Sequence, residues 1–227
     1  EFQPGTTTVI WTVTDGAGNT AQCSFTVSIE DEEAPTITTC PGNKTANTAM
    51  GICTYTQSGT GWNVIADDNC TVSLIEYILT GVTTGTVNSL DGVVFNKGVT
   101  NINVIVYDGA ATPNTNTSCR YSVTVSDNEN PTVTCPSNIA VNNDNDDCNS
   151  VVTIPEITFG DNCTGATLAW STSGATEISG SGQPGQQTFN TGVTTVTFTV
   201  TDAATKTATC NFTVTVTDNQ LPEITCP

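Results

Sequence analysis

A ten-residue motif that recurs along the chain constrains the fold more than any other feature of the sequence. Asp-Asn, two variable residues, Pro, three variable residues and Cys-Pro span Asp127 to Pro136 and again Asp218 to Pro227, and a longer, degenerate copy spans Asp31 to Pro41. A unit repeated in tandem usually supplies reach, rigidity and display surface, whereas a catalytic constellation is more often built once. The motif therefore predicts a structural or adhesive repeat protein, and we expect the sequence to be a piece of a longer chain.

The cysteines recur with the same period as the motif. Cys40 and Cys135 lie 95 residues apart, Cys135 and Cys226 lie 91 apart, and Cys53 and Cys148 lie 95 apart. Units of about 90 residues can form a core of their own, although covalent cross-links help to stabilise domains of that size. The period predicts the end of one repeat (1–30), two complete repeats (31–126 and 127–217) and the first strand of a further repeat (218–227).

Charge and cysteine content exclude several functions. The formal net charge is −18, from 22 acidic and four basic residues, and the chain has no histidine. Phosphate backbones require Lys and Arg, and an anionic membrane surface repels such a chain, so we expect no nucleic-acid partner and no direct membrane insertion. Ten cysteines without a Cys-x-x-Cys pair favour disulfides over a zinc or iron site, which predicts a secreted or cell-surface location.

Each unit carries the same pair of Thr- and Val-rich segments, in which apolar and polar residues alternate. This period of two predicts strands with one buried face. The predicted core-facing residues of the first segment are Val9, Trp11 and Val13, then Ile102, Val104 and Val106, then Val196, Phe198 and Val200; the second segment starts at Cys23, Cys119 or Cys210 and continues with Phe25, Val27 and Ile29, with Tyr121, Val123 and Val125, or with Phe212, Val214 and Val216.

An earlier apolar strand carries Ile75 and Tyr77, matched in the next unit by Leu168 and Trp170. Together with short strands around each Cys-Pro pair, this gives about seven strands per unit. The sequence therefore predicts an all-β chain of tandem immunoglobulin-like β-sandwich domains in an end-to-end rod.

The ordered set of these features resembles the hyalin repeat (HYR) family. The set consists of Cys-Pro, a second Cys, Asp-Asn-Cys, a strand ending in Thr-Val-Thr-Asp, and Cys-x-Phe-x-Val-x-Val-x-Asp, and it covers essentially the whole chain. The repeat from Asp31 departs most, with Asp-Glu-Glu-Ala-Pro in the linker and a longer loop from Asp108 to Cys119. The resemblance implies an immunoglobulin-like fold and a role in cell adhesion or the extracellular matrix.

The same resemblance implies a disulfide pairing that the sequence alone leaves open, since four cysteines allow three connectivities. In a sandwich of this type the first and last strands begin at the same pole, and family members with only two cysteines keep the pair that joins them. This implies Cys40 with Cys119 and Cys135 with Cys210, which leaves Cys53 with Cys70 and Cys148 with Cys163, while Cys23 and Cys226 pair outside the chain. Consecutive pairing, such as Cys119 with Cys135, is the competing alternative.

Acidic residues gather at three places in each complete repeat: the linker motif, the Asp-Asn-Cys loop and the residue after the long strand. If domains join end to end, these three segments meet at one pole. Carboxylate and amide oxygens from separate loops are ligands for calcium, which takes six to eight at a time. The candidate ligands are Asp31, Glu32, Glu33, Asp67, Asp68, Asn69 and Asp108 in the first complete repeat, and Asp127, Asn128, Glu129, Asp161, Asn162 and Asp202 in the second.

Simpler interpretations compete with these sites. Asp and Asn are common turn formers, so Asp-Asn in a loop is often only a capped turn. Without histidine there is no histidine-based triad, and the scattered lysines offer no evident base for a nucleophile, so we expect no enzyme. Among the tryptophans, Trp62 follows a glycine-rich stretch and is the candidate for an exposed carbohydrate-binding platform.

The sequence thus predicts a non-enzymatic extracellular module of a surface adhesin, matrix protein or filament, stabilised by disulfides and by interdomain calcium. A carbohydrate- or ligand-binding module is the alternative. Expected partners are neighbouring repeats of the same chain, other copies in a filament, or cell-surface glycans.

Overall fold

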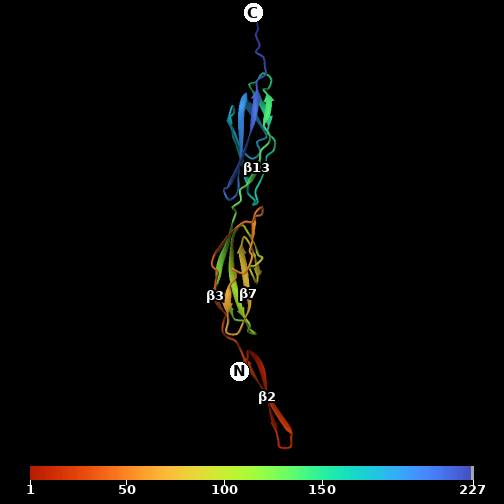
Figure 1. Cartoon of the computed structure of the whole chain (residues 1–227), viewed down its shortest axis with the longest axis vertical. Coiled ribbons are helices and arrows are strands. Elements are labelled where there is room, and N and C mark those ends of the chain that lie inside the picture. The colour runs from red at the N-terminus through yellow and green to blue at the C-terminus, as the bar shows by residue number, and fades with distance from the viewer. Residues whose placement is uncertain (226–227) are drawn as a thin grey trace. The chain divides into compact units, whose positions relative to one another are not determined.

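The computed structural model describes residues 1–225, and all regular structure in that range is β (Figure 1). Within these residues no helix is long and apolar enough to span a bilayer. The chain divides into two compact units. The first unit contains Glu1–Ala46 and Thr54–Ser126, and the second contains Asn47–Cys53 and the residues from Asp127 onward. The change of unit after Ser126 falls at the start of the second copy of the repeated motif.

The first unit begins with a two-stranded antiparallel ribbon, β1 (Gly5–Thr14) and β2 (Thr20–Ile29). Val9 lies opposite Phe25 and Trp11 opposite Cys23, which places the predicted apolar residues on one face. The expectation that this face is buried was wrong, because Trp11 is 63% exposed, Val13 69% and Phe25 50%. Residues 1–30 form only these two strands, and the second layer that covers the equivalent face in the complete repeats has no counterpart among them.

Residues 31–126 form a sandwich whose larger sheet has the strand order β4-β12-β10-β7-β8, with β11 paired to β10. Two short antiparallel pairs, β3 with β6 and β5 with β9, make the other layer. The strands are β3 (Thr36–Thr39), β4 (Lys44–Asn47), β5 (Thr54–Thr56), β6 (Ile65–Asp67), β7 (Val72–Gly81), β8 (Gly85–Val87), β9 (Val94–Asn96), β10 (Gly98–Asp108), β11 (Thr115–Asn116) and β12 (Arg120–Ser126).

Residues 127–217 repeat this topology. The larger sheet has the order β14-β21-β20-β17-β18, and the short pairs are β13 with β16 and β15 with β19. The strands are β13 (Thr132–Thr134), β14 (Ile139–Asn142), β15 (Asn149–Thr153), β16 (Thr158–Gly160), β17 (Thr167–Gly174), β18 (Ser179–Ser181), β19 (Gln186–Asn190), β20 (Gly192–Thr201) and β21 (Thr207–Thr217). Both complete repeats are therefore immunoglobulin-like β-sandwiches, as the sequence predicted.

The Cys-Pro pair marks the point where the chain changes sheets. In the second repeat β13 pairs antiparallel with β16, and after Cys135 and Pro136 the chain continues as β14, which pairs in parallel with β21. Proline has no backbone N–H for a ladder bond, so a strand is interrupted there at little cost. Three residues after each cysteine, an asparagine side chain accepts from the last strand: Asn43 Oδ1 from Ser122 N at 2.9 Å and Asn138 Oδ1 from Thr213 N at 2.9 Å.

The alternation of apolar residues predicts the core of both complete repeats correctly. Ile102, Val104 and Val106 on β10 are at most 1% exposed, as are Val196, Phe198 and Val200 on β20. The matching residues of β12 and β21 complete each core, together with Tyr77 in one repeat and Leu168 and Trp170 in the other. Burying one face of a long hairpin against a second layer supplies the main hydrophobic stabilisation.

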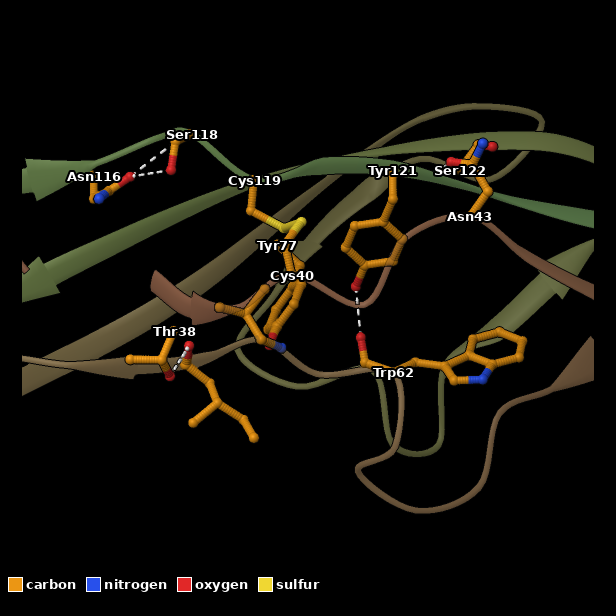
Figure 2. Close-up of a disulfide and its surroundings, with 12 residues drawn as sticks. Thr38, Cys40, Asn43, Trp62, Tyr77, Asn116, Ser118, Cys119, Tyr121 and Ser122 are labelled. Atoms are coloured by element: carbon orange, nitrogen blue, oxygen red, sulfur yellow. Dashed lines mark hydrogen bonds between the residues drawn. A yellow bond between two sulfur atoms is a disulfide. The ribbon is translucent and has the colours of Figure 1, made fainter. Parts of the chain in front are cut away.

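Disulfides link the first and last strands of both sandwiches. Cys40 is bonded to Cys119, as Figure 2 shows, and Cys135 is bonded to Cys210. Both pairs implied by the resemblance are therefore present. In the interior beside Cys119, Tyr121 donates its hydroxyl to the Trp62 carbonyl at 2.6 Å (Figure 2).

The other two predicted pairs, Cys53 with Cys70 and Cys148 with Cys163, were wrong. Cys53 is bonded to Cys163, and Cys70 and Cys148 carry exposed free thiols, as does Cys23. The cause is the position of Asn47–Cys53, which by sequence belongs to the first complete repeat but contacts the residues of the second unit.

The segment after Thr217 was predicted to start another strand. Residues 218–225 form no strand, so this expectation was wrong for the residues that the structure describes. Cys226 lies outside the described residues.

Candidate acidic cation sites

The aspartate that opens each linker forms a tight local turn. Asp31 Oδ1 accepts from Glu33 N at 3.2 Å, and Asp127 Oδ1 accepts from Glu129 N at 3.2 Å. Such side-chain-to-backbone bonds explain why the linker needs Asp at this position. For Asp31, the other carboxylate oxygen, Oδ2, is buried and takes no part in the turn.

The aspartate of the Asp-Asn-Cys loop behaves in the same way. Asp68 Oδ2 accepts from the backbone N–H groups of Cys70 and Thr71, both at 3.0 Å, and Asp161 Oδ2 accepts from Cys163 N at 3.1 Å. The other oxygens, Asp68 Oδ1 and Asp161 Oδ1, are buried and receive no hydrogen bond. The capped-turn interpretation therefore explains one oxygen of each side chain and leaves the other unexplained.

The third aspartate ends the long strand of each sandwich. Asp108 is fully buried: Oδ1 accepts from the backbone of Ala110 at 3.1 Å and of Asn114 at 3.0 Å, and Oδ2 accepts from Asn114 Nδ2 at 2.7 Å. Burial tends to raise the pKa of Asp108, but these hydrogen bonds outweigh it and hold the pKa below its ordinary value. Asp108 is therefore kept as a carboxylate.

In the first unit these three aspartates converge. Asp31, Asp68 and Asp108 each place a carboxylate oxygen within 4.8 Å of the others. Asp31 Oδ2 and Asp68 Oδ1 are buried and have no hydrogen-bond donor. The same charges act on a neighbour: the close Asp31 carboxylate, then burial and the charges of Asp31, Asp68 and Asp108, raise the pKa of the Cys70 thiol. We call this group, Asp31, Asp68 and Asp108, the first acidic cluster.

In the second unit the equivalent residues converge less completely. Asp127 and Asp161 lie within 4.8 Å of each other and of the Cys163 sulfur, but that sulfur is in a disulfide and offers no thiolate. Asp202 is 5% exposed and does not belong to this group. Its Oδ1 accepts hydrogen bonds from Ala204 N at 2.8 Å and Lys206 N at 2.7 Å, while its Oδ2 is buried and receives no hydrogen bond. We call Asp127 and Asp161 the second acidic cluster.

The remaining predicted ligands lie outside these clusters. Glu32, Glu33, Asp67, Asn69 and Asn128 are exposed. Glu129 Oε2 accepts from Gly51 N at 2.9 Å, so it holds the segment that contains Cys53. Asn162 Nδ2 donates to Ile52 O at 3.1 Å and Thr48 Oγ1 at 3.3 Å, while its Oδ1 is buried and has no partner.

One important residue of the first unit was missed. Asn114 Nδ2 donates to Asp108 Oδ2, to the Asp31 carbonyl at 3.1 Å and to the Glu33 carbonyl at 3.3 Å, which joins the linker to the hairpin loop. The extra length of the Asp108-to-Cys119 loop was the available signal, because it allows Asn114 to reach the linker. No motif in the sequence points to this residue.

Trp62 is not the exposed platform that was predicted. It is half-buried and packs against the core, with its ring centroid 5.5 Å from that of Tyr55 in a stacked arrangement and 6.1 Å from that of Phe95. Stacking of this kind stabilises the interior. The neighbouring glycines do expose the backbone, but the indole side chain turns inward.

Comparisons with known proteins agree with the repeat pattern. The model of the HYR domain matches residues 1–29 and 126–216. Hyalin of Strongylocentrotus purpuratus is 32% identical over the whole chain, which spans 18% of the length of that protein.

Similar solved structures include protocadherin gamma B2 extracellular cadherin domains 1–5, with 13% identity, coverage of 96% of this chain and 47% of that chain, and a TM-score of 0.36. Fibronectin(III)-like modules of Clostridium thermocellum CbhA are 15% identical, with coverage of 85% of this chain and 99% of that chain, and a TM-score of 0.31.

Proposed function

The chain belongs to the HYR domain family, and we propose that it is an extracellular adhesion-type repeat module whose linkers are fixed by calcium. The family membership and the three disulfides support the extracellular, adhesion-type role. The first acidic cluster supports the calcium.

The observation that carries the proposal is the convergence of Asp31, Asp68 and Asp108, in which two buried carboxylate oxygens, Asp31 Oδ2 and Asp68 Oδ1, make no hydrogen bond. A buried charged acceptor without a partner costs about 1 to 3 kcal/mol or more. Three carboxylates this close also repel one another. A bound cation removes both penalties, because it gives the oxygens a ligand and neutralises their charge.

The donor set selects calcium among the common cations. Every ligand atom of the first acidic cluster is a carboxylate oxygen, and the chain has no histidine. Zinc and other softer metals favour nitrogen and sulfur ligands, whereas calcium accepts oxygen ligands in flexible numbers and completes its coordination with water. Asp31, Asp68 and Asp108 would hold the ion, and Asn114 would orient Asp108 and the linker.

Binding at this position would have a mechanical consequence. Asp31 belongs to the linker, Asp68 to the loop before β7, and Asp108 to the end of β10. A shared ion ties these three segments together and restricts the segment through which the sandwich joins the preceding sequence. The second acidic cluster would serve the same purpose at Asp127, where Asp161 Oδ1 also lacks a donor.

Calorimetric titration of calcium into the chelator-treated chain tests this function. We expect dissociation constants of about 10⁻⁴ to 10⁻³ M, the range of extracellular modules. Asp31→Asn should weaken binding at the first acidic cluster about tenfold, because it removes one charged ligand. Glu32→Gln, an exposed neighbour in the same linker, is the matched control and should leave the isotherm unchanged. Absence of binding heat, or identical isotherms for the chain and Asp31→Asn, would overturn the proposal.

A further inference from the structure

The two free thiols Cys70 and Cys148 occupy repeat positions whose counterparts are bonded to each other. Cys53 and Cys148 each lie 13 residues after the cysteine of a Cys-Pro pair, and each immediately precedes a strand, β5 or β15. Cys70 and Cys163 each end an Asp-Asn-Cys sequence and lie before β7 or β17. Cys53–Cys163 thus joins the second cysteine of one repeat to the third cysteine of the next.

Hydrogen bonds surround this disulfide and explain why the bond crosses from one repeat to the next. Asn162 Nδ2 donates to Ile52 O at 3.1 Å, immediately before Cys53, and Gly51 N donates to Glu129 Oε2 at 2.9 Å. Asn162 precedes Cys163, and Glu129 belongs to the linker copy that follows the repeat of Cys53. The segment with Cys53 is therefore held against the linker and the Asp-Asn-Cys loop that come after it in the sequence.

The segment with Cys148 makes the corresponding contacts to the next linker copy. Asn143 Nδ2 donates to Asp218 Oδ1 at 3.3 Å, and Asn143 Oδ1 accepts from Asn219 N at 3.3 Å. Asp218 and Asn219 open the third copy of the motif. Cys148 is thus an exposed thiol on a segment that already holds the linker leading onward, as the Cys53 segment holds the linker at Asp127.

We propose that Cys53–Cys163 is one member of a periodic series of cross-repeat disulfides. In this series Cys148 bonds the Asp-Asn-Cys cysteine of a HYR repeat that follows Asp218, and Cys70 bonds the cysteine equivalent to Cys53 in the repeat that precedes Asp31. Each repeat is then joined covalently to both neighbours in addition to the peptide chain. This assignment rests on the cysteine positions and does not depend on calcium.

The chemistry of each added bond is a two-electron oxidation. Two thiols lose two protons and two electrons, one S–S bond forms, and a disulfide oxidant such as oxidised glutathione is reduced to two thiols. An oxidising extracellular compartment supplies oxidants of this class.

A chain extended by one repeat tests the proposal. A second copy of residues 127–217 is inserted after Thr217, the protein is folded in a glutathione redox buffer, and alkylated peptides are mapped by mass spectrometry without reduction. We expect a bond between Cys148 of the original repeat and the Cys163 equivalent of the inserted repeat. Cys148→Ser should leave that inserted cysteine alkylated, whereas the control Cys23→Ser should keep the bond. A bond between the two cysteines of one repeat, or alkylation of both thiols, would overturn the proposal.

The chain of 227 residues offers a second measurement that needs no added repeat. The Cys53→Ser variant removes the partner of Cys163. Cys148, which lies in the same repeat as Cys163, is then free to bond it if pairing within one repeat is possible. We expect both Cys148 and Cys163 to be alkylated, with Cys40–Cys119 and Cys135–Cys210 still formed as evidence of folding. Formation of Cys148–Cys163 would show that pairing within one repeat is available and would contradict the cross-repeat rule.

Discussion

Asp68→Asn should stabilise the first unit in chelator and should remove most of the stabilisation that calcium gives. Asp68 Oδ2 accepts the N–H groups of Cys70 and Thr71, and the amide oxygen of asparagine can accept the same two bonds. The amide nitrogen then takes the place of Oδ1, where it can donate to Asp31 Oδ2, which has no donor. The substitution therefore removes a charge while preserving the turn.

The magnitude follows from the separation of the carboxylates. Two unit charges 4.8 Å apart repel by about 3 kcal/mol at an effective dielectric constant of about 20. Asp68 faces two such charges, but solvent screening at Asp31 and Asp68, which are only partly buried, reduces the net effect to about 1 to 3 kcal/mol. In chelator, Asp68→Asn should raise the free energy of unfolding by this amount. In calcium at about 100 times its dissociation constant, the unsubstituted chain should gain about 2.7 kcal/mol, and the variant should gain much less.

Denaturant unfolding followed by tryptophan fluorescence measures both effects, because Trp62 packs in the core of the first unit and reports its loss. Asp67→Asn is the matched control: it is the adjacent aspartate, it is exposed, and it lies outside the first acidic cluster. We expect this control to unfold like the unsubstituted chain in both buffers. Destabilisation by Asp68→Asn in chelator, together with an undiminished gain in calcium, would refute the reasoning.

Two further substitutions test the interior. Tyr121→Phe should cost about 1 to 3 kcal/mol, because it leaves the part-buried Trp62 carbonyl without its donor. Burial, and then the nearby Tyr77, raise the pKa of Tyr121. The stability that the neutral hydroxyl contributes is therefore fully present below the unfolded pKa of about 10 and is lost as pH rises above it, so the stability of the variant should fall less steeply with pH. Gly174→Ala should destabilise the second unit by several kcal/mol more than the control Gly182→Ala. Both glycines have positive φ, but only at Gly174 would the new Cβ lie 2.5 Å from the Val193 carbonyl oxygen. Equal melting temperatures of the two variants would contradict this prediction.

The strand pattern could be predicted because it depends on local sequence. Alternating apolar residues must share one face of a strand, so Val104 and Phe198 could be assigned to the core from the sequence alone. The same reasoning was wrong for Trp11, because alternation identifies an apolar face but does not show that another layer covers it. Burial requires strands distant in sequence, and the first 30 residues contain only the closing ribbon.

The sequence predicted which segments carry the acidic residues, but the fold decided which of these residues form the first acidic cluster. Turn chemistry alone could place Asp31, Asp68 and Asp108 at the ends of strands and in loops. Which carboxylate oxygens remain without donors depends on backbone N–H groups and on Asn114, which the tertiary structure brings to the linker. Glu32 and Asp67 have the same chemistry in the sequence but are exposed, because successive residues of an extended segment face opposite sides.

The sequence and its family pattern predicted the repeat period, the all-β class and the two sandwiches. They also predicted the disulfides that join the first and last strands, Cys40–Cys119 and Cys135–Cys210. They did not predict the partner of Cys53, which was settled by the packing of the folded chain. When every repeat carries cysteines at the same spacing, bonding within a repeat and bonding to the next repeat give the same sequence pattern. The choice depends on which loop the Asn47–Cys53 segment packs against, and hydrogen bonds from Gly51 and Asn162 place it beside Cys163.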